Sequence, residues 1–575
     1  MLWFVYLPKE IKMQRLIECI PNISEGSDRE KISTIASVVE NVPGVMLLDV
    51  DPGASTNRTV ITFAGEPEAV AEAAFQLIKK AAELIDMRHH KGAHPRQGST
   101  DVCPMVPISG VTMEECVALA HKLGERVGKE LGIPGYFYEY AAKNEQRKNL
   151  ANCRKGEYEG LEKITTKEWT PDFGPNKISD EVRRSGITTI GARVFLVAYN
   201  VNLNTTSTRR ANAIAFDIRE AGRMVTNPKT GNPELDEKGN PKQIPGTLKA
   251  VKGIGWFIEE YGIAQLSLNL TNIEITPVHI AFEEACSRAD ERGIRVTGSE
   301  LVGLIPKKSM LDAADYFLKK QQRSLGISEK EKIKIAVKSL GLDDLAPFKP
   351  EEKIIEYIIE KKLGQKKKLV NLNLREFANE TSSELPAPGG GSISAYAGAL
   401  SASLAAMVAN LSAHKRGWDE RWEEFSDVAV RAMSLQEKLL TLVDEDTLAF
   451  NKIMEAFALP KNSDDEKKLR SDAIESASKY ALEIPLLTAQ LSLECLKVCG
   501  EMVDKGNPNS VTDAGVGALC ARAAVLGATM NVRINASGIK DKLFTERALN
   551  EVAVLEAEAE KIEAKIRLSV SGRMS

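Results

Sequence analysis

Several features that would assign a protein class at once are missing from this sequence of 575 residues. Its eight cysteines are scattered and form no Cys-x-x-Cys pair, which argues against a disulfide-rich secreted protein and favours a reducing cytoplasm. The formal net charge is only −4, so nothing draws the whole chain toward nucleic acid or an anionic membrane. The apolar run in residues 1–13 lacks a preceding basic segment and a cleavage site, so we expect no signal peptide. We interpret residues 1–13 as an extension, with Met13 as the biological start.

The first 358 residues alternate strand-like and helical patterns. Strand-like runs lie near residues 15–20, 45–50, 58–64 and 135–141, and the helical stretches between them predict an antiparallel sheet with helices on one face. The same order recurs after about residue 192. The sequence therefore predicts a multidomain protein that begins with two α+β subdomains of the βαββαβ type, at residues 14–193 and 194–358. Inside the second, residues 224–246 contain four prolines and predict an exposed hairpin or loop insertion.

Strand patterns nearly vanish beyond a lysine-rich linker at residues 359–370. Helical periodicity predicts an all-α bundle at residues 371–575. Helices are expected at residues 372–381, 391–414, 419–457, 464–483, 486–504, 509–530 and 538–571. The stretch from Ser392 to Ala413 carries no charge, but alanine, serine and glycine dominate it. This composition favours close helix packing, within the bundle or between subunits, over a membrane span.

Three of the six histidines, at positions 89, 90 and 94, lie close together. Glycines and prolines between residues 86 and 107 exclude a regular helix, so these imidazoles are expected on a stiffened loop. Such a loop indicates proton chemistry or metal binding. For His89 and His90 a plain polar loop is the alternative. A metal site is disfavoured because Gly92 and Pro95 deny the histidines a helix on which their spacing would converge.

His94 is the strongest candidate for a proton acceptor, because Pro95 restricts its backbone and an imidazole titrates near neutral pH. Arg96 beside it is a candidate for holding an anionic group with two hydrogen bonds. Asp51 ends a strand on the same face as Asp49. We interpret Asp51 as an orienting partner for a histidine, with a turn-capping role as the alternative.

Two further candidates lie in the helical region. Three glycines, Gly389, Gly390 and Gly391, precede Ser392; they match neither a phosphate-binding loop nor a dinucleotide motif. Consecutive glycines before a helix still let backbone N–H groups approach a ligand, although a tight helix entry is the alternative.

The second candidate is an acidic run inside an otherwise apolar helix. Asp446 shares a helical stripe with Leu439 and Val443 and is predicted to point inward, whereas Asp444 lies at the edge of that stripe. A carboxylate in apolar surroundings has a raised pKa and can act as a general acid. A solvated acidic patch is the alternative.

With these segments together, the chain from Met13 to about Arg573 closely resembles the bifunctional formimidoyltransferase-cyclodeaminase family of histidine breakdown and one-carbon metabolism. The matching motifs lie at residues 18–26, 48–51, 55–59, 90–96, 101–104, 171–175, 253–256, 298–306, 387–392 and 443–450. So many motifs in the family's order make the resemblance highly specific.

The resemblance implies that the N-terminal half transfers a formimino group from N-formimino-L-glutamate to tetrahydrofolate. His94 would take the proton from folate N5, and Asp51 would support that imidazole. The stretch at 174–186 matches the family's folate-binding segment, although it is slightly longer here and carries two arginines. The residues in question are Gly174, Pro175, Arg183, Arg184 and Gly186.

The helical part would close N10 onto the formimino carbon, release ammonia and give 5,10-methenyltetrahydrofolate. The family's catalytic aspartate is Asp444 or Asp446, and inward geometry favours Asp446. The resemblance further implies a homo-oligomer, a ring of dimers. We also expect folate to carry a polyglutamate tail that prefers lysine- and arginine-lined grooves. No metal, nucleic acid or membrane partner is expected.

Three other hypotheses stay open. In one, only the transferase is active and the helical domain serves assembly. In another, the chain is a folate-binding scaffold without turnover. A zinc hydrolase is the most remote.

Overall fold

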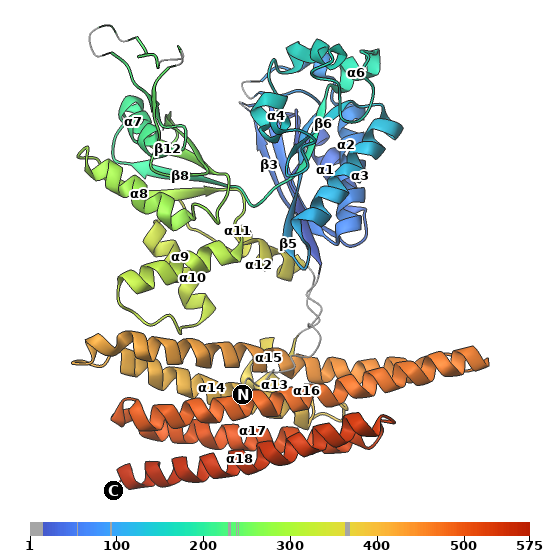
Figure 1. Ribbon diagram of the computed structural model, residues 1–575, viewed down its shortest axis with the longest axis vertical. Helices are drawn as coiled ribbons and strands as arrows, with labels where there is room; N and C mark the ends of the chain where they lie inside the picture. The colour runs from blue at the N-terminus through green and yellow to red at the C-terminus, as the bar shows by residue number, and fades with distance from the viewer. Residues whose placement is uncertain are drawn as a thin grey trace. The chain divides into compact units, whose positions relative to one another are not determined.

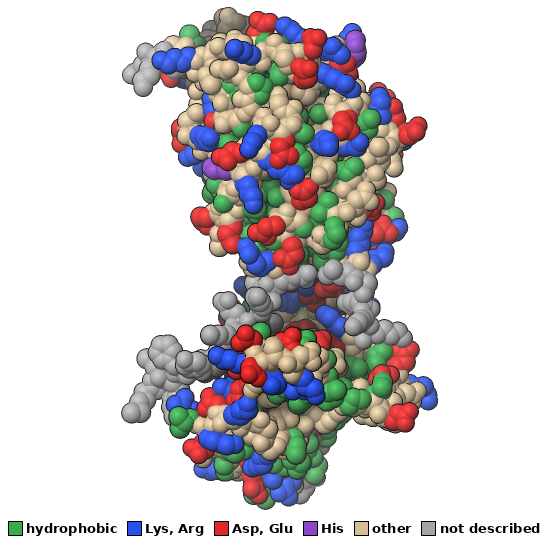
Figure 2. Space-filling model, turned by 90° about the vertical axis from the view of Figure 1, so that its right-hand side faces the viewer, with side chains coloured by type: hydrophobic (Ala, Val, Ile, Leu, Met, Phe, Trp, Pro, Cys, Tyr) green, Lys and Arg blue, Asp and Glu red, His purple; other side chains and the backbone are tan. Residues whose placement is uncertain are grey.

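The computed structural model describes residues 15–54, 56–92, 95–227, 230, 232–236, 239, 241–362 and 368–574. The chain divides into two compact units (Figure 1). The first comprises Met1–Ala313 and Val337–Gly364, and contains both sheets. The second comprises Ala314–Ala336 and Gln365–Ser575, and is helical. Acidic and basic side chains are interspersed on the face shown in Figure 2, in keeping with the small formal net charge of −4.

The first sheet has seven strands in the order β1-β4-β2-β5-β7-β6, with β3 paired to β4. The strands are β1 (Leu16–Cys19), β2 (Asn22–Ile23), β3 (Val45–Gly53), β4 (Arg58–Gly65), β5 (Thr100–Ser109), β6 (Gly135–Glu139) and β7 (Thr188–Ala192). The predicted antiparallel sheet is wrong in part, because β7 pairs in parallel with both β5 and β6. Strand β5 was not predicted, because its two prolines count against a strand.

Three helices cover one face of this sheet: α1 (Arg29–Glu40), α2 (Pro67–Leu84) and α3 (Met113–Leu131) (Figure 1). Shorter elements connect β6 to β7 and complete this part of the chain. They are α4 (Glu145–Lys148), α5 (Leu150–Cys153), η2 (Tyr158–Thr165) and α6 (Asp180–Ser185), while η1 (Met87–His89) precedes β5.

The opposite face of the first sheet is covered only in part. Isoleucines 355, 358 and 359 of α12 (Ile355–Lys362) pack against Leu16, Leu48 and Ala64 of that face. At β6 the same face carries a second apolar cluster, in which Tyr136 and Tyr138 pack with residues of α5, η2 and α6, and charged side chains lie between the two clusters. Helix α12, which lies more than 290 positions after β3 in the sequence, therefore covers the apolar end of this sheet face but not its charged part.

The second sheet is antiparallel, in the order β11-β12-β8-β13. Its strands are β8 (Val197–Leu203), β11 (Val251–Ile258), β12 (Ile263–Leu270) and β13 (Val296–Val302), with α7 (Thr208–Ile218) and α8 (Val278–Asp290) against one face. The predicted hairpin in the proline-rich insertion is confirmed at its base, where β9 (Arg223–Met224) pairs with β10 (Gln243–Ile244). The helices α9 (Lys307–Lys320), α10 (Glu329–Leu340) and α11 (Pro350–Lys353) follow.

In the second unit α14 to α18 lie side by side (Figure 1). The elements are η3 (Leu369–Asn371), α13 (Leu374–Thr381), α14 (Gly390–Ala413), η4 (Asp419–Arg421), α15 (Trp422–Ala458), α16 (Asp464–Lys505), η5 (Pro508–Ser510), α17 (Val511–Ala536) and α18 (Lys542–Met574). The all-helical prediction is confirmed, but the two helices predicted at 464–483 and 486–504 are one. Pro485 lies inside α16, and the carbonyl of Ala481 that its missing N–H leaves free accepts a hydrogen bond from Asn535 Nδ2 at 2.7 Å.

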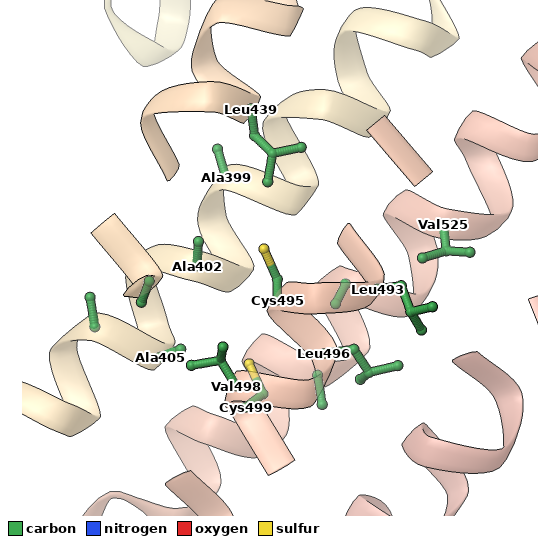
Figure 3. Packing of buried hydrophobic residues seen from close by; sticks show 14 of the residues in the cluster. Ala399, Ala402, Ala405, Leu439, Leu493, Cys495, Leu496, Val498, Cys499 and Val525 are labelled. Carbon is green, nitrogen blue, oxygen red and sulfur yellow. The ribbon is translucent and has the colours of Figure 1, made fainter. Parts of the chain in front are cut away.

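Small side chains let the helices of the bundle approach closely. Alanines 399, 402 and 405 of α14 face Leu439 of α15 and Cys495, Val498 and Cys499 of α16 (Figure 3). By length and composition α14 and the stretch Pro508–Ala536 are apolar enough to cross a membrane. Of the most apolar part of α14, however, 61% is buried within the bundle, as close helix packing requires.

Candidate active sites

The uncovered face of the first sheet gathers charged residues around Arg58, the first residue of β4. Asp51 lies on the paired strand β3 opposite Val60, and shares its face with Asp49. Burial, followed by the neighbouring charge of Asp51, raises the pKa of Asp49. Burial and the charge of Arg154 lower the pKa of Arg58 to about 10, while Asp101 and Asp51 act in the opposite direction. Arg58 therefore interacts electrostatically with Asp51, Asp101 and Arg154.

A buried network fixes the cationic side of this cluster. Asp101 is 1% exposed, forms an ion pair with Arg154 and accepts a hydrogen bond from the backbone N–H of Gln97 at 3.0 Å. Lys163 Nζ donates to Gln97 Oε1 at 3.0 Å. Burial lowers the pKa of Lys163 to about 8. The cluster thus places Arg58, Arg154 and Lys163 close to three aspartates, and its cationic side can attract an anionic ligand.

The histidine loop is tied to the turn between β3 and β4. Asn57, in a left-handed conformation with φ 49°, donates from Nδ2 to the carbonyl of Lys91 at 2.7 Å. His90 Nε2 lies 2.9 Å from the carbonyl of Asn57. Gly92 packs so closely on Thr56 that a Cβ at 92 would lie 2.4 Å from a backbone oxygen. The loop therefore meets the sheet beside Arg58 and the strand of Asp51. His94 itself lies outside the described residues.

Arg96 is engaged within the protein. Its guanidinium forms ion pairs with Glu157 at 3.0 Å and Glu159 at 2.7 Å, and its Nε donates to His90 Nδ1 at 3.3 Å. Arg96 and the two glutamates line a pocket of about 560 Å³ together with Lys91, Gly92 and Gly156. A substrate carboxylate would have to displace one of these glutamates to reach Arg96.

The segment predicted to bind folate is spread over two sides of the first sheet. The guanidinium of Arg184 donates a hydrogen bond to the carbonyl of Glu83 at the end of α2. The backbone carbonyl of Arg183 accepts a hydrogen bond from the hydroxyl of Tyr158. Gly174 and Pro175 lie near the end of α3, with Gly174 packed on Ile133. Gly186, at φ 70°, lies so close to Gln97 that a Cβ would meet its carbonyl oxygen at 2.1 Å. Among these residues the structure brings Gly186 next to the charged cluster.

Several residues of this face escaped sequence reasoning, Glu18 and Tyr138 among them, although Glu18 begins one of the matching motifs. Glu18 is 2% exposed and interrupts the apolar strand β1. Burial raises its pKa to about 7, with Arg193 opposing and Glu356 adding to that effect. Tyr138 is also buried and responds to the charge of Arg193. A lone glutamate among apolar residues of a strand was the available signal.

A second arrangement lies at the start of α14 in the helical unit. Asp446 of α15 accepts hydrogen bonds on Oδ2 from the backbone N–H of Ser392 at 2.8 Å and from its hydroxyl at 2.9 Å. Gly391 has no room for a side chain, because a Cβ would lie 2.0 Å from Asp446 Oδ1. Burial raises the pKa of Asp446, and the two bonds from Ser392 oppose that effect. The structure therefore joins the predicted glycine segment to one of the two predicted aspartates.

The neighbouring acidic residues have other partners. Asp444 Oδ1 accepts a hydrogen bond from the backbone N–H of Leu369 at 2.7 Å, and burial raises its pKa. Glu445 accepts one from the hydroxyl of Tyr480 on α16. Gly390 lies near Asn531 of α17, while a Cβ at Gly389 would make only an ordinary contact of 3.6 Å with the carbonyl oxygen of Pro386. Among the described residues no group of three histidine, cysteine, aspartate or glutamate side chains is placed to hold a metal ion.

Family models and relatives cover nearly the whole chain. A formiminotransferase domain, N-terminal subdomain, matches residues 16–193, a formiminotransferase domain matches 198–360, and a formiminotransferase-cyclodeaminase model matches 373–554. A formimidoyltransferase-cyclodeaminase of Gallus gallus is 43% identical over 551 residues, which cover 96% of this chain and 97% of that protein.

Two shorter relatives each match part of the chain. A glutamate formimidoyltransferase of Streptococcus pyogenes serotype M1 is 42% identical, covering 53% of this chain and 94% of that protein. A methenyltetrahydrofolate cyclohydrolase of Methylorubrum extorquens is 34% identical, covering 36% of this chain and 99% of that protein.

Proposed function

The chain belongs to the formimidoyltransferase-cyclodeaminase family, and from that membership we propose how its two sites divide the two reactions. It is a bifunctional enzyme that transfers the formimino group of N-formimino-L-glutamate to tetrahydrofolate and then cyclises the product to 5,10-methenyltetrahydrofolate with release of ammonia. The observation that carries this conclusion is the similarity to full-length bifunctional relatives, which extends over both units.

The charged face of the first sheet is our proposed transferase site. Folate N5 attacks the formimino carbon, the bond from that carbon to the glutamate nitrogen breaks, and glutamate leaves as an amine. His94 accepts the N5 proton and returns it to the departing nitrogen, with Asp51 orienting the imidazole. Arg58 supplies positive charge for the carboxylates of the donor, and Arg154 holds Asp101 beside it. Support comes from the anchoring of the histidine loop beside Arg58.

The start of α14 is our proposed cyclodeaminase site. N10 attacks the formimino carbon and loses its proton, the bond to the former imino nitrogen breaks, and that nitrogen leaves as ammonia after gaining two protons, one equivalent to that lost by N10 and one from an acid. Asp446 is the proton donor, because burial raises its pKa and so favours the protonated form at higher pH than for a free aspartate. Asp444 is the weaker candidate, since its carboxylate holds the backbone of Leu369.

The outer surface of the bundle supports the proposal of a homo-oligomer. Helix α14 is buried on every side except one apolar stripe, formed by Ile393, Leu400, Met407 and Leu411, which are 37–47% exposed. Helix α17 packs against α14 and carries a second exposed stripe. A helix that is apolar all round belongs in an interior. We therefore propose that the same stripes of a second copy cover this surface in a symmetric dimer.

Coupled activity is tested by supplying formimino-glutamate and tetrahydrofolate to the purified protein. Ammonia release and the near-ultraviolet absorbance of methenyl-folate should rise together. His94→Ala should lose transfer but still cyclise supplied 5-formimino-tetrahydrofolate, whereas Asp446→Asn should do the reverse. Asp444→Asn is the matched control. If it abolishes cyclisation while Asp446→Asn does not, the two aspartates exchange roles.

A further inference from the structure

Two of the matching motifs have no place in the sites described so far. Residues 253–256 lie in β11 and residues 298–306 begin in β13, at opposite edges of the second sheet. Antiparallel register places Ile254, Ser267, Asn200 and Glu300 in one row across the four strands. Because paired residues share a face, both motifs contribute to the face opposite α7 and α8.

That face holds an ordered ladder of amides around one carboxylate. Glu300 Oε2 accepts hydrogen bonds from Asn200 Nδ2 at 3.1 Å and Gln265 Nε2 at 3.2 Å, and Oε1 accepts from the Tyr261 hydroxyl at 3.4 Å. Gln265 Nε2 also donates to Asn202 Oδ1 at 2.8 Å. The Glu300 carboxylate is therefore held in one position by donors from three directions.

The ladder has an unused acceptor and an apolar border. Gln265 is fully buried, and its Oε1 makes no hydrogen bond within the described protein. On the next strand Trp256 and Ile254 are 41% and 51% exposed on the same face. A solvated sheet face normally carries long charged or hydroxyl side chains. Fixed polar groups bordered by exposed apolar side chains are instead the composition of a ligand site.

A series of neighbouring charges connects this face with the transferase site. Lys252 lies on the same face, two positions before Ile254. Burial raises the pKa of Glu139, at the end of β6, and the charges of Lys252 and Arg193 oppose that effect. Arg193 also acts on Tyr138, which in turn acts on Arg58. Arg193 follows β7 of the first sheet, where its N–H donates to the carbonyl of Met105 at 3.0 Å, and shortly precedes β8 of the second sheet, so both faces belong to one compact unit.

We propose that Glu300 and its supporting amides bind the 2-amino-4-oxopyrimidine edge of the reduced pterin of folate. This subsite rests on the transferase function proposed above. Oε1 of Glu300 has one acceptor site left and accepts a 2-amino hydrogen, and Gln265 Oε1 accepts a ring N–H of the same edge. Trp256 and Ile254 supply apolar surface for the ring. The dianionic formimino-glutamate is repelled by Glu300, so the subsite selects the neutral ring.

Glu300→Gln tests the proposal in the full-length protein, because it keeps the shape and removes the charge. We expect the KM for tetrahydrofolate to rise about tenfold to a hundredfold, since hydrogen bonds to a charged group are lost. The KM for formimino-glutamate should stay within twofold. The exposed Glu259→Gln, in the turn between β11 and β12, removes the same charge and should change neither.

A reduced pterin without the aminobenzoyl-glutamate tail identifies the part of folate that is bound. Tetrahydropterin should inhibit transfer by the native protein and by Glu259→Gln, but only weakly by Glu300→Gln. Trp256→Ala, at an exposed position, should also weaken that inhibition severalfold. Equal inhibition of Glu300→Gln and native protein would overturn the proposal.

Two readouts distinguish a failure of this proposal from a general loss of folding and from a failure of the proposed function. Cyclisation of supplied 5-formimino-tetrahydrofolate should be unchanged in Glu300→Gln, because that reaction belongs to the helical unit. A lowered unfolding midpoint with an unchanged KM for tetrahydrofolate would make the ladder purely structural and overturn the proposal. If the native protein transfers no formimino group yet binds tetrahydropterin through Glu300, the proposed function fails while the subsite stands.

Discussion

Gly391→Ala offers a way to move the proposed general acid without changing its chemistry. A methyl group at position 391 would lie 2.0 Å from Asp446 Oδ1, far inside van der Waals contact. The obstructing atom is the end of a side chain rather than backbone. We therefore expect α14 to keep its path and the carboxylate of Asp446 to rotate away from Ser392.

The size of the effect follows from the bonds that this rotation breaks. Asp446 accepts two hydrogen bonds from Ser392, and each bond to a charged group contributes about 1.5–3 kcal/mol. Alanine favours the helical conformation over glycine by roughly 1 kcal/mol, which offsets part of that loss. The net cost is about 2–5 kcal/mol. If the transition state needs the same carboxylate position, cyclisation slows by about thirtyfold to several thousandfold.

The assay is the rate of methenyl-folate formation from supplied 5-formimino-tetrahydrofolate. Gly389→Ala is the matched control, because a Cβ there would have Pro386 O as its nearest neighbour, at an ordinary 3.6 Å. Transfer to tetrahydrofolate should be unchanged in both variants. Cyclisation by Gly391→Ala within threefold of the Gly389→Ala rate would refute the idea that the Asp446 position governs this reaction.

Three further perturbations test other parts of the molecule. Burial holds the pKa of Glu18 at about 7 in the folded state against 4.5 otherwise, so its contribution to stability is complete below pH 4.5 and is lost as the pH rises through 7. Between pH 4.5 and pH 8 the free energy of unfolding of Glu18→Gln should therefore rise by roughly 3 kcal/mol relative to that of the native protein. The unfolding midpoints of the two proteins should diverge over this range; if they change in parallel, the burial argument is wrong. Arg58→Gln should raise the KM for formimino-glutamate about tenfold or more and spare that for tetrahydrofolate, and steady-state kinetics giving the opposite pattern would remove Arg58 as the anion receptor. Met407→Asp should lower the mass measured by sedimentation, because it places a charge in the exposed stripe of α14; an unchanged mass would reject that interface.

Hydrophobic periodicity predicted most of the helices and strands, and it failed at two elements that contain proline. Prolines at 104 and 107 count against a strand, yet both lie in β5. Pro107 is tolerated because the register between β1 and β5 shifts beside it. Pro485 suggested a break between two helices, but a side chain of α17 satisfies the carbonyl that proline leaves free. In both cases a distant partner, which local sequence does not reveal, decides the outcome.

The candidate sites show the same division between local and distant information. Asp446 was singled out from its helical stripe, and its contact with Ser392 was not predictable because 54 positions separate them. Arg96 was interpreted as an anion receptor from its place beside His94. Two glutamates more than 60 positions away occupy its guanidinium, and only the folded chain shows this. Residue type therefore predicted which groups are reactive, whereas tertiary pairing determines which of them are available.

The two sites set their acids and bases by different physical means. On the first sheet Asp101 forms an ion pair with Arg154, which fixes the side chains around Arg58, the proposed receptor for the donor's carboxylates. In the bundle no cation forms an ion pair with Asp446 within the described residues, and burial favours its protonated form. The first reaction needs positive charge to bind a dicarboxylate, and the second needs a proton for departing ammonia. The sheet supplies positive charge through its paired side chains. The helix bundle supplies a proton, because its apolar interior surrounds the carboxyl group of Asp446.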